Sequence, residues 1–191
     1  MRWVLAIAMA VLAFGLLRAN AQIPAPNSQH YDNFDYQFST DLPQRFQACV
    51  DENTNHGVVI LLNSTVCRGF SKIAPRIAIF ANYNVPYEAR TPAQLARHDC
   101  SASRFDPAPR RIEWLHAPTL GGRRAVGCCQ YFRDGRIAEW IVTLHKTDEP
   151  VWDWIEVAAY LETTTGRYAK DLRIFRRVLK GVWIHPDGPF D

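Results

Sequence analysis

The alternation of apolar and polar residues is clearest between Ala125 and Thr163, where it predicts three consecutive antiparallel strands. Asp134-Gly135 separates the first two strands, and Asp148-Glu149-Pro150 separates the second from the third. In the third strand the apolar residues that alternate with polar or amphipathic ones are Ile155, Val157, Ala159 and Leu161. This period is typical of a strand with one face in the core, so we expect the other elements to pack on these three strands.

The register of the first hairpin depends on the length of its loop. Asp-Gly is typical of a two-residue loop, which would place Cys129 opposite Trp140 on the better core face of the hairpin. Cys128 would then point to the other, partly covered face. A three-residue loop with a bulge would exchange the two faces, and the unfavourable pairing of Arg133 with Arg136 keeps that alternative open.

Shorter segments before this meander are also predicted to be strands. Phe34, Tyr36 and Phe38 alternate with polar residues, as in a half-buried strand. The other segments with strand-like apolar patterns are Val58–Leu62, Arg76–Val85 and Arg111–His116. The first of these three is a continuous apolar run, which is typical of a central strand covered on both faces.

Two segments carry the signals of helices. Thr91 is a suitable N-cap, followed by Pro at the first helical position and by Gln94 in place for a capping box, so a short helix is expected to end near Cys100. The second helix is predicted over Tyr168–Lys180, with Gly181 as its C-terminal cap. Its apolar stripe consists of Tyr168, Leu172, Phe175, Val178 and Leu179.

Together these elements predict an α+β fold, a mainly antiparallel sheet with a short middle helix and a C-terminal amphipathic helix packed on it. No internal repeat or low-complexity segment is apparent. We expect a single globular domain over residues 31–191, preceded by a flexible polar leader over residues 22–30.

Residues 1–21 have the pattern of a secretory signal peptide. The uncharged run over residues 3–17 is shorter than the about 20 residues that a membrane-spanning helix needs, although a retained anchor is the alternative. Cleavage is expected after Ala21, and because no cysteine follows until Cys49, a lipid anchor at the new N-terminus is not expected. The sequence therefore predicts a secreted or periplasmic protein with no membrane span in the mature chain.

The charge balance argues against a nucleic-acid binder. The chain has 22 Lys and Arg against 19 Asp and Glu, and removing Arg2 and Arg18 with the signal peptide leaves 20 against 19. A nucleic-acid binder would show a clustered basic footprint.

The expected partner is another envelope or secreted protein.

The cysteines predict two disulfides and one unpaired thiol, because all five follow the signal peptide into an oxidising compartment. Neighbours on a strand point to opposite faces, so Cys128 and Cys129 are not expected to bond each other. We expect Cys49 to pair with Cys67, since both flank the Val58–Leu62 strand. Cys100 is expected to pair with Cys128 or Cys129, and the cysteine left over is expected to be a buried, inert thiol.

Catalytic and metal-binding patterns are weak in this sequence. A nucleophilic cysteine with a histidine base could be formed by Cys100 with His98 or by Cys129 with His145, but no catalytic motif surrounds either cysteine. No metal or cofactor is predicted, because the candidate ligands lack a recognised spacing; they are His56, His98, His116, His145 and His185.

The order of elements resembles the PsbP/DcrB-like group of secreted α/β sandwich domains. The opening FDYQFSTDLPQRF is similar to the first strand and "LP" turn of that group, and TTGRYAKDLRIFRRVLKGV is similar to its last helix. The five cysteines and the segment Asn63–Pro75 are not part of the pattern. The resemblance implies an accessory or binding protein and supplies no catalytic motif.

We therefore expect a non-enzymatic protein that binds another protein, such as an inhibitor, an immunity-type protein or an envelope accessory factor. A possible binding patch consists of Trp152, Trp154, Tyr160, Trp183, Arg173 and Arg177. The alternative for Trp154 is that the C-terminal segment with Trp183 covers it. The alternative functions are a cysteine-dependent hydrolase or redox enzyme, and a small-ligand binder that uses an aromatic face of the sheet.

Overall fold

The computed structural model describes residues 28–50, 56–67, 75–83, 89, 91–101, 107–146 and 154–185. The predicted signal peptide and residues 22–27 of the predicted leader lie outside these ranges. Strand β1 begins at Ser28, within the segment interpreted as a leader. Neither helix in the described ranges has the length and apolar character that crossing a membrane requires.

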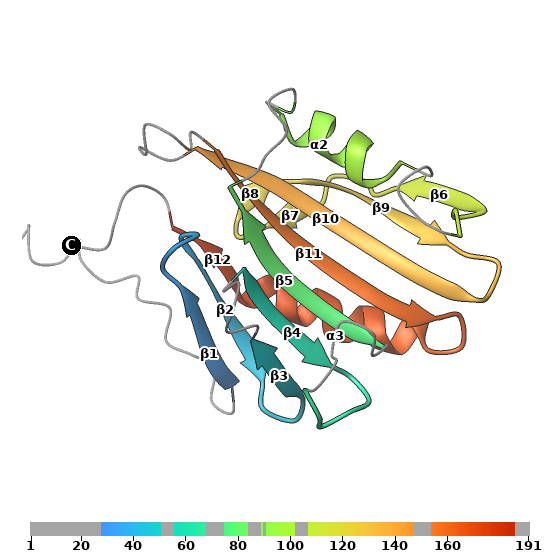
Figure 1. Ribbon diagram of the computed structural model, residues 1–191, viewed down its shortest axis with the longest axis horizontal. Coiled ribbons are helices and arrows are strands. Elements are labelled where there is room, and N and C mark those ends of the chain that lie inside the picture. Colours follow the sequence, from blue (N-terminus) through green and yellow to red (C-terminus); the bar gives the residue numbers. More distant parts are fainter. Residues whose placement is uncertain are drawn as a thin grey trace, which may run out of the picture.

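The centre of the fold is an antiparallel sheet of seven strands in the order β3-β4-β5-β11-β10-β9-β6 (Figure 1). Its two longest strands are β10 and β11, which pair along their whole length and come from the predicted meander. The strand bounds are β3 Gln47–Val50, β4 Gly57–Leu61, β5 Arg76–Asn82, β6 Arg111–Trp114, β9 Val126–Tyr131, β10 Arg136–Lys146 and β11 Trp154–Thr164.

Two smaller sheets and two helices complete the described structure. Strands β1 (Ser28–Asn33), β2 (Phe38–Pro43) and β12 (Val182–Ile184) form one small sheet, and β7 (Thr119–Leu120) and β8 (Arg123–Arg124) form the other. The helices are α2 (Pro92–Asp99) and α3 (Tyr168–Gly181). The predicted fold class is confirmed, because a short middle helix and a C-terminal amphipathic helix pack on a mainly antiparallel sheet.

The two helices cover opposite faces of the large sheet. On β11, Val157, Ala159 and Leu161 belong to the core beneath α3, whereas Ala158 belongs to a second cluster beneath α2. We call these surfaces the α3 face and the α2 face. Both faces of the central strands are therefore buried.

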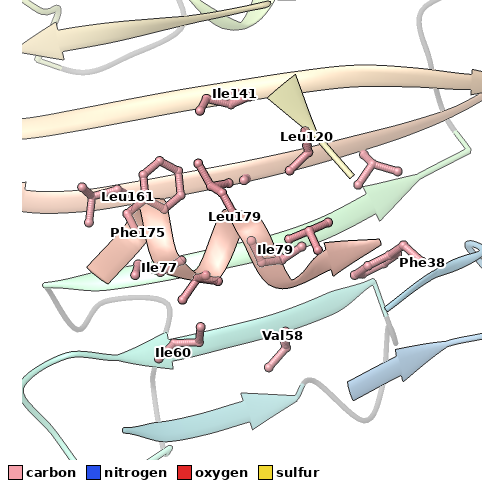
Figure 2. Packing of buried hydrophobic residues seen from close by; sticks show 14 of the residues in the cluster. Phe38, Val58, Ile60, Ile77, Ile79, Leu120, Ile141, Leu161, Phe175 and Leu179 are labelled. Atoms are coloured by element: carbon pink, nitrogen blue, oxygen red, sulfur yellow. The ribbon is translucent and has the colours of Figure 1, made fainter. Parts of the chain in front are cut away.

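The larger core lies between the α3 face, helix α3 and the β1-β2-β12 sheet. Phe175 of α3 packs among Ile77, Leu161 and other aliphatic side chains of the sheet, and Phe38 of β2 adds the second large ring (Figure 2). Phe38 and Phe175 have no exposed surface. This core joins the C-terminal helix to the first described strands of the chain.

The N-terminal strand was predicted in the wrong place. Residues 34–37 form a turn between β1 and β2, Phe34 is 64% exposed, and Gln37 has a φ of 54°. The physical cause is a side-chain turn: the Tyr36 backbone N–H donates a hydrogen bond to Asn33 Oδ1 at 3.1 Å. Asn is a residue that favours such turns, and the alternating aromatic residues hid this signal.

The predicted two-residue loop of the β9–β10 hairpin was also wrong. Tyr131 lies opposite Ile137, and the Phe132 N–H donates to the carbonyl oxygen of Arg136, which leaves three residues in the loop. Gly135 has a φ of 85°, and the Asp134 carboxylate accepts hydrogen bonds from the backbone N–H and the Nε–H of Arg136 at 3.0 and 2.7 Å. These bonds stabilise the three-residue loop.

This register decides the surroundings of the adjacent cysteines. Cys128 lies opposite Trp140 on the α2 face, and Cys129 lies opposite Glu139 on the α3 face. The alternative with exchanged faces is therefore the one that the structure adopts. Lengthening the loop by one residue exchanges the two faces because side chains alternate between the faces of a strand with a period of two.

Both predicted helices are confirmed. The Thr91 hydroxyl caps α2 by accepting a hydrogen bond from the Gln94 N–H at 3.2 Å. Helix α3 buries Ile174, Phe175, Val178 and Leu179. The prediction of Gly181 as the C-terminal cap was wrong, because Gly181 is the last helical residue and Val182, with an extended backbone, takes the C-cap position. A Cβ at Gly181 would lie 3.1 Å from Asp41 Cβ, so the glycine permits close approach of the helix end to β2.

Candidate functional site

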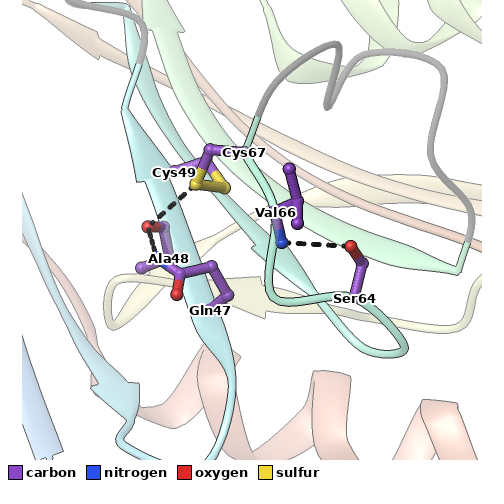
Figure 3. The surroundings of a disulfide bond; sticks show 6 residues. All are labelled: Gln47, Ala48, Cys49, Ser64, Val66 and Cys67. Carbon is purple, nitrogen blue, oxygen red and sulfur yellow. Dashed lines mark hydrogen bonds between the residues drawn. A yellow bond between two sulfur atoms is a disulfide. The ribbon is translucent and has the colours of Figure 1, made fainter.

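The two disulfides attach peripheral segments to the large sheet. Cys49 on edge strand β3 is bonded to Cys67, which follows β4, and the Cys67 sulfur lies 3.6 Å from the carbonyl oxygen of Ala48 (Figure 3). Cys100, at the C-terminal end of α2, is bonded to Cys128 of β9. The second bond therefore joins the short helix covalently to the face that it covers.

Cys129 is the free cysteine, and it lies buried beneath α3. Its sulfur is 3.5 Å from the Tyr168 hydroxyl oxygen, and that hydroxyl donates a hydrogen bond to Glu139 Oε2 at 2.9 Å. A phenol has one proton, so the thiol is the donor to Tyr168. Burial raises the pKa of the Cys129 thiol, and this disfavours the nucleophilic thiolate.

Neither cysteine–histidine pair considered from the sequence is formed. Cys100 is held in a disulfide, so it supplies no nucleophile beside His98. His145 lies six residues along β10 from Glu139, the residue opposite Cys129, which is a distance of about 20 Å at the rise of a strand. The His145 Nε2 atom instead lies 3.0 Å from Gln37 Oε1.

The thiol of Cys129 is expected to react with a soluble disulfide reagent only after unfolding, because its side chain is buried and its pKa is raised. Thiol titration of the native protein should release no chromophore within minutes, and titration in denaturant should release one equivalent per chain. A Cys129→Ala variant should release none in either condition. Rapid release from the native protein would show an accessible, reactive thiol and would favour the enzymatic alternative.

The residues of the possible binding patch do not form one surface in the described structure. Trp154 and Tyr160 lie on the α2 face of β11, whereas Arg173 and Arg177 are exposed on α3 on the other side of the sheet. Trp183 lies on β12, between two residues of the core beneath α3, and it therefore does not cover Trp154. The remaining member, Trp152, is outside the described residues.

Tyr160 belongs to an aromatic group on the α2 face. Its ring centroid is 4.6 Å from that of Trp140, which in turn meets Phe80 edge-on at 5.8 Å. All three side chains are partly buried. This contact explains why an aromatic residue stands between Glu156 and Glu162 on that face of β11: the Tyr160 ring packs against Trp140 of the neighbouring strand.

The outer side of α3 is strongly basic. Lys170, Arg173, Arg176, Arg177 and Lys180 are all exposed. A helix turns by about 100° per residue, which places the five side chains on an arc of about 120°. The single acidic residue of the helix, Asp171, is fully buried and accepts hydrogen bonds from Thr163 and Arg167. We call these five residues the basic face of α3.

One arginine of the basic face is held by a buried acid. Arg176 forms an ion pair with Glu139 of β10 at 2.5 Å; the Glu139 side chain has no exposed surface, and that of Arg176 is 43% exposed. Burial raises the pKa of the Glu139 carboxyl, while the Arg176 guanidinium and the Tyr168 hydroxyl lower it. Cys129, Tyr168, Glu139 and Arg176 thus form a continuous chain of polar contacts from the sheet to the surface.

A pocket of about 450 Å³ lies where Arg176 reaches the surface. Its walls come from the C-terminal half of α3 and from the segment between β6 and β8; the lining includes Leu115, His116, Thr119, Arg176, Leu179 and Lys180. None of the described residues that line it is Asp or Glu. We call this site the α3 pocket.

Sequence analysis did not find the α3 pocket. The only local signal was Glu139, an acidic residue within an otherwise apolar part of β10. His116 was considered only as a metal ligand, and within the described residues no group of three or more His, Cys, Asp or Glu side chains could hold a metal ion. The site joins three segments that lie far apart in the chain, so no motif of fixed spacing could indicate it.

Comparison with solved structures finds similarity over most of the chain. The solution structure of cyanobacterial PsbP (CyanoP) from Synechocystis sp. PCC 6803 has a TM-score of 0.49 and 13% identity, and covers 88% of this chain and 99% of that chain. LpqN, involved in cell envelope biogenesis of Mycobacterium tuberculosis, has a TM-score of 0.49 and 14% identity, with coverage of 84% and 93%. A mutant of the protein Mog1 has a TM-score of 0.47 and 9% identity, with coverage of 85% and 97%.

These three proteins share the PsbP/Mog1/DcrB-like fold, which includes the group that the order of elements resembles. No family model matches the sequence, and the search of curated proteins finds no match. At this level of similarity, activity and partners have to be inferred from the geometry of the chain itself.

Proposed function

We propose that this protein is a secreted or periplasmic, non-enzymatic binding protein, and that the basic face of α3 docks an acidic protein partner. The observation that carries the proposal is the separation of charge on α3: five exposed basic residues and one acidic residue that is buried. Two disulfides fit an oxidising compartment, and the pattern of residues 1–21 supports export with cleavage after Ala21.

The basic face is suited to recognition because it is rigid and four of its five positive charges are not neutralised by an acidic group in the described structure. Phe175 and Val178 anchor α3 in the core, so the exposed side chains project from a fixed backbone. Within the described residues Lys170, Arg173, Arg177 and Lys180 have no ion pair with an acidic group. A surface of one sign steers an oppositely charged partner, and it acts mainly on the rate of association and on specificity.

The proposal is tested by reversing charge on the basic face. The variant Arg173→Glu/Arg177→Glu should lower the affinity for the partner at least about tenfold, mostly through the association rate, because four units of charge change at the contact. The partner would be captured from envelope extract, purified, and measured in a binary binding assay at several salt concentrations. Wild-type affinity should fall as salt rises.

The matched control is Arg97→Glu/Arg133→Glu, which makes the same change of charge at two exposed sites outside α3. It should bind the partner within about twofold of wild type, because exposed charges beyond the contact are largely screened. A partner that binds Arg173→Glu/Arg177→Glu as tightly as wild type would refute the docking surface. An extract from which the wild-type protein retains no acidic protein would also count against the proposal.

A further inference from the structure

We propose that the α3 pocket binds a small organic anion, whose carboxylate or phosphate group is held by Arg176, Lys180 and His116. The pocket shares Arg176 and Lys180 with the basic face of α3, but Arg173 and Arg177 do not line it and its ligand is a small molecule. The volume of about 450 Å³ falls within the range of small-molecule sites. The inference does not depend on the protein partner proposed above.

The charge of the pocket has one sign. Arg176 and Lys180 contribute to its lining, His116 adds a third nitrogen-bearing side chain, and the described lining contains no carboxylate. Lys180 has no ion pair within the described residues. An oxyanion that enters the pocket would therefore meet donors without displacing an acidic group from Lys180.

The buried carboxylate of Glu139 holds the Arg176 side chain in place at the pocket. Glu139 is fully buried, accepts a hydrogen bond from the Tyr168 hydroxyl at 2.9 Å, and forms an ion pair with Arg176 at 2.5 Å. The guanidinium has five N–H donors in a planar fork, and this ion pair leaves donors available toward the pocket. Its orientation is therefore set before a ligand arrives, which lowers the entropy lost on binding.

The buried carboxylate is difficult to explain by stability alone. A buried ion pair contributes little to stability compared with apolar residues of the same volume, because both charges lose their hydration. Here the carboxylate stands on a strand whose neighbours on the α3 face include Ile137 and Ile141. A positioning role for Glu139, which acts on the ligand through Arg176, explains its presence.

The walls of the pocket indicate that the anion carries an apolar part. Three apolar residues contribute to the lining, and of these Leu115 is partly exposed whereas Leu179 and Val182 are buried. A bare inorganic ion would leave Leu115 partly uncovered, whereas a ligand with a ring or a short hydrocarbon would cover it. We therefore assign the ligand to the class of small aromatic or aliphatic carboxylates and phosphate esters.

The test is a titration of the full mature chain, at constant ionic strength, with phenyl phosphate, benzoate and inorganic phosphate. Binding would be followed by amide chemical shifts, which should change at Leu115 and Lys180 and not on α2. Phenyl phosphate or benzoate should bind more tightly than inorganic phosphate, because only these probes cover the apolar wall. The tighter of the two distinguishes a phosphate ester from a carboxylate as the preferred group.

Two variants remove the donors and keep the fold. Lys180→Gln changes an exposed side chain, and Glu139→Gln/Arg176→Gln removes both buried-pair charges together, so that no unpaired charge remains buried. Each should weaken binding of the preferred probe about tenfold or more, since each removes a charge-assisted hydrogen bond. Arg173→Gln/Arg177→Gln should bind the probe within about twofold of wild type.

Equal binding by wild type and by both pocket variants would overturn the inference, and so would the absence of saturable binding of every probe. A loss as large in Arg173→Gln/Arg177→Gln as in Lys180→Gln would assign the binding to diffuse positive charge and overturn it as well. The docking proposal is tested with Arg173→Glu/Arg177→Glu and the purified partner, so failure of one proposal is distinguishable from failure of the other.

Discussion

Replacement of Phe175 with alanine is expected to lower the free energy of unfolding by about 3–5 kcal/mol, the largest effect that we expect from a single substitution in α3. The Phe175 side chain has no exposed surface and packs between the helix and the central strands (Figure 2). The cost combines the lost burial of the ring with the cavity that remains, because the surrounding β-strands cannot collapse into it. Urea unfolding followed by tryptophan fluorescence would measure the change.

Lys170→Ala is the control for Phe175→Ala, because Lys170 is exposed on the same helix and alanine is a good helix former. It should change the free energy of unfolding by less than about 0.5 kcal/mol. A domain of this kind has a total stability of about 5–15 kcal/mol, so the core variant should lose a large part of it. A loss below about 1.5 kcal/mol for Phe175→Ala would show that α3 is not anchored as described.

Removal of the Cys100–Cys128 disulfide in the variant Cys100→Ala/Cys128→Ala is expected to cost about 3–4 kcal/mol. The bond closes a loop with a sequence separation of 28, and its loss increases the entropy of the unfolded chain. It also ties α2 to β9, and both half-cystines are buried, so the two alanines leave unfilled volume beneath the helix. Urea unfolding should show a lower midpoint and a steeper dependence on denaturant, because the unfolded chain expands.

The matched control is Cys49→Ala/Cys67→Ala, in which the sequence separation is 18. The difference in loop length changes the entropic contribution by only a few tenths of a kcal/mol. Cys67 is less buried than Cys49, so the second variant loses less packing and should cost about 3 kcal/mol. A larger loss for this control would contradict the importance that we assign to the α2 attachment.

The helices and most strands could be predicted because their signals are local. Thr91 and Gln94 specify the start of α2 by their own hydrogen bonds, and the apolar stripe of α3 follows from a period of 3.6. The alternation of β11 likewise requires one face in the core. These patterns also made the fold class accessible, because a sheet with apolar residues on both faces needs a cover on each.

Errors occurred where a local pattern had two solutions. Phe34, Tyr36 and Phe38 fit a strand, but the Asn33 side chain closes a turn there and leaves Phe34 exposed. Asp134-Gly135 fits both a two-residue and a three-residue loop, and the bonds between Asp134 and Arg136 favour the second. The candidate site was missed for another reason: its residues come from β10, α3 and the β6–β8 segment, and only folding brings them together.

The sequence by itself therefore determined the α+β class, the apolar stripe of α3, and the need to place Cys128 and Cys129 on opposite faces, because periodicity and composition act over a few neighbouring residues. Only the tertiary structure decided which cysteine meets Cys100 and which lies beneath α3, because one additional loop residue inverts every side chain of the hairpin. It also decided that Glu139 holds Arg176 at the α3 pocket, since that contact depends on the packing of a helix across a strand 37 residues earlier in the chain.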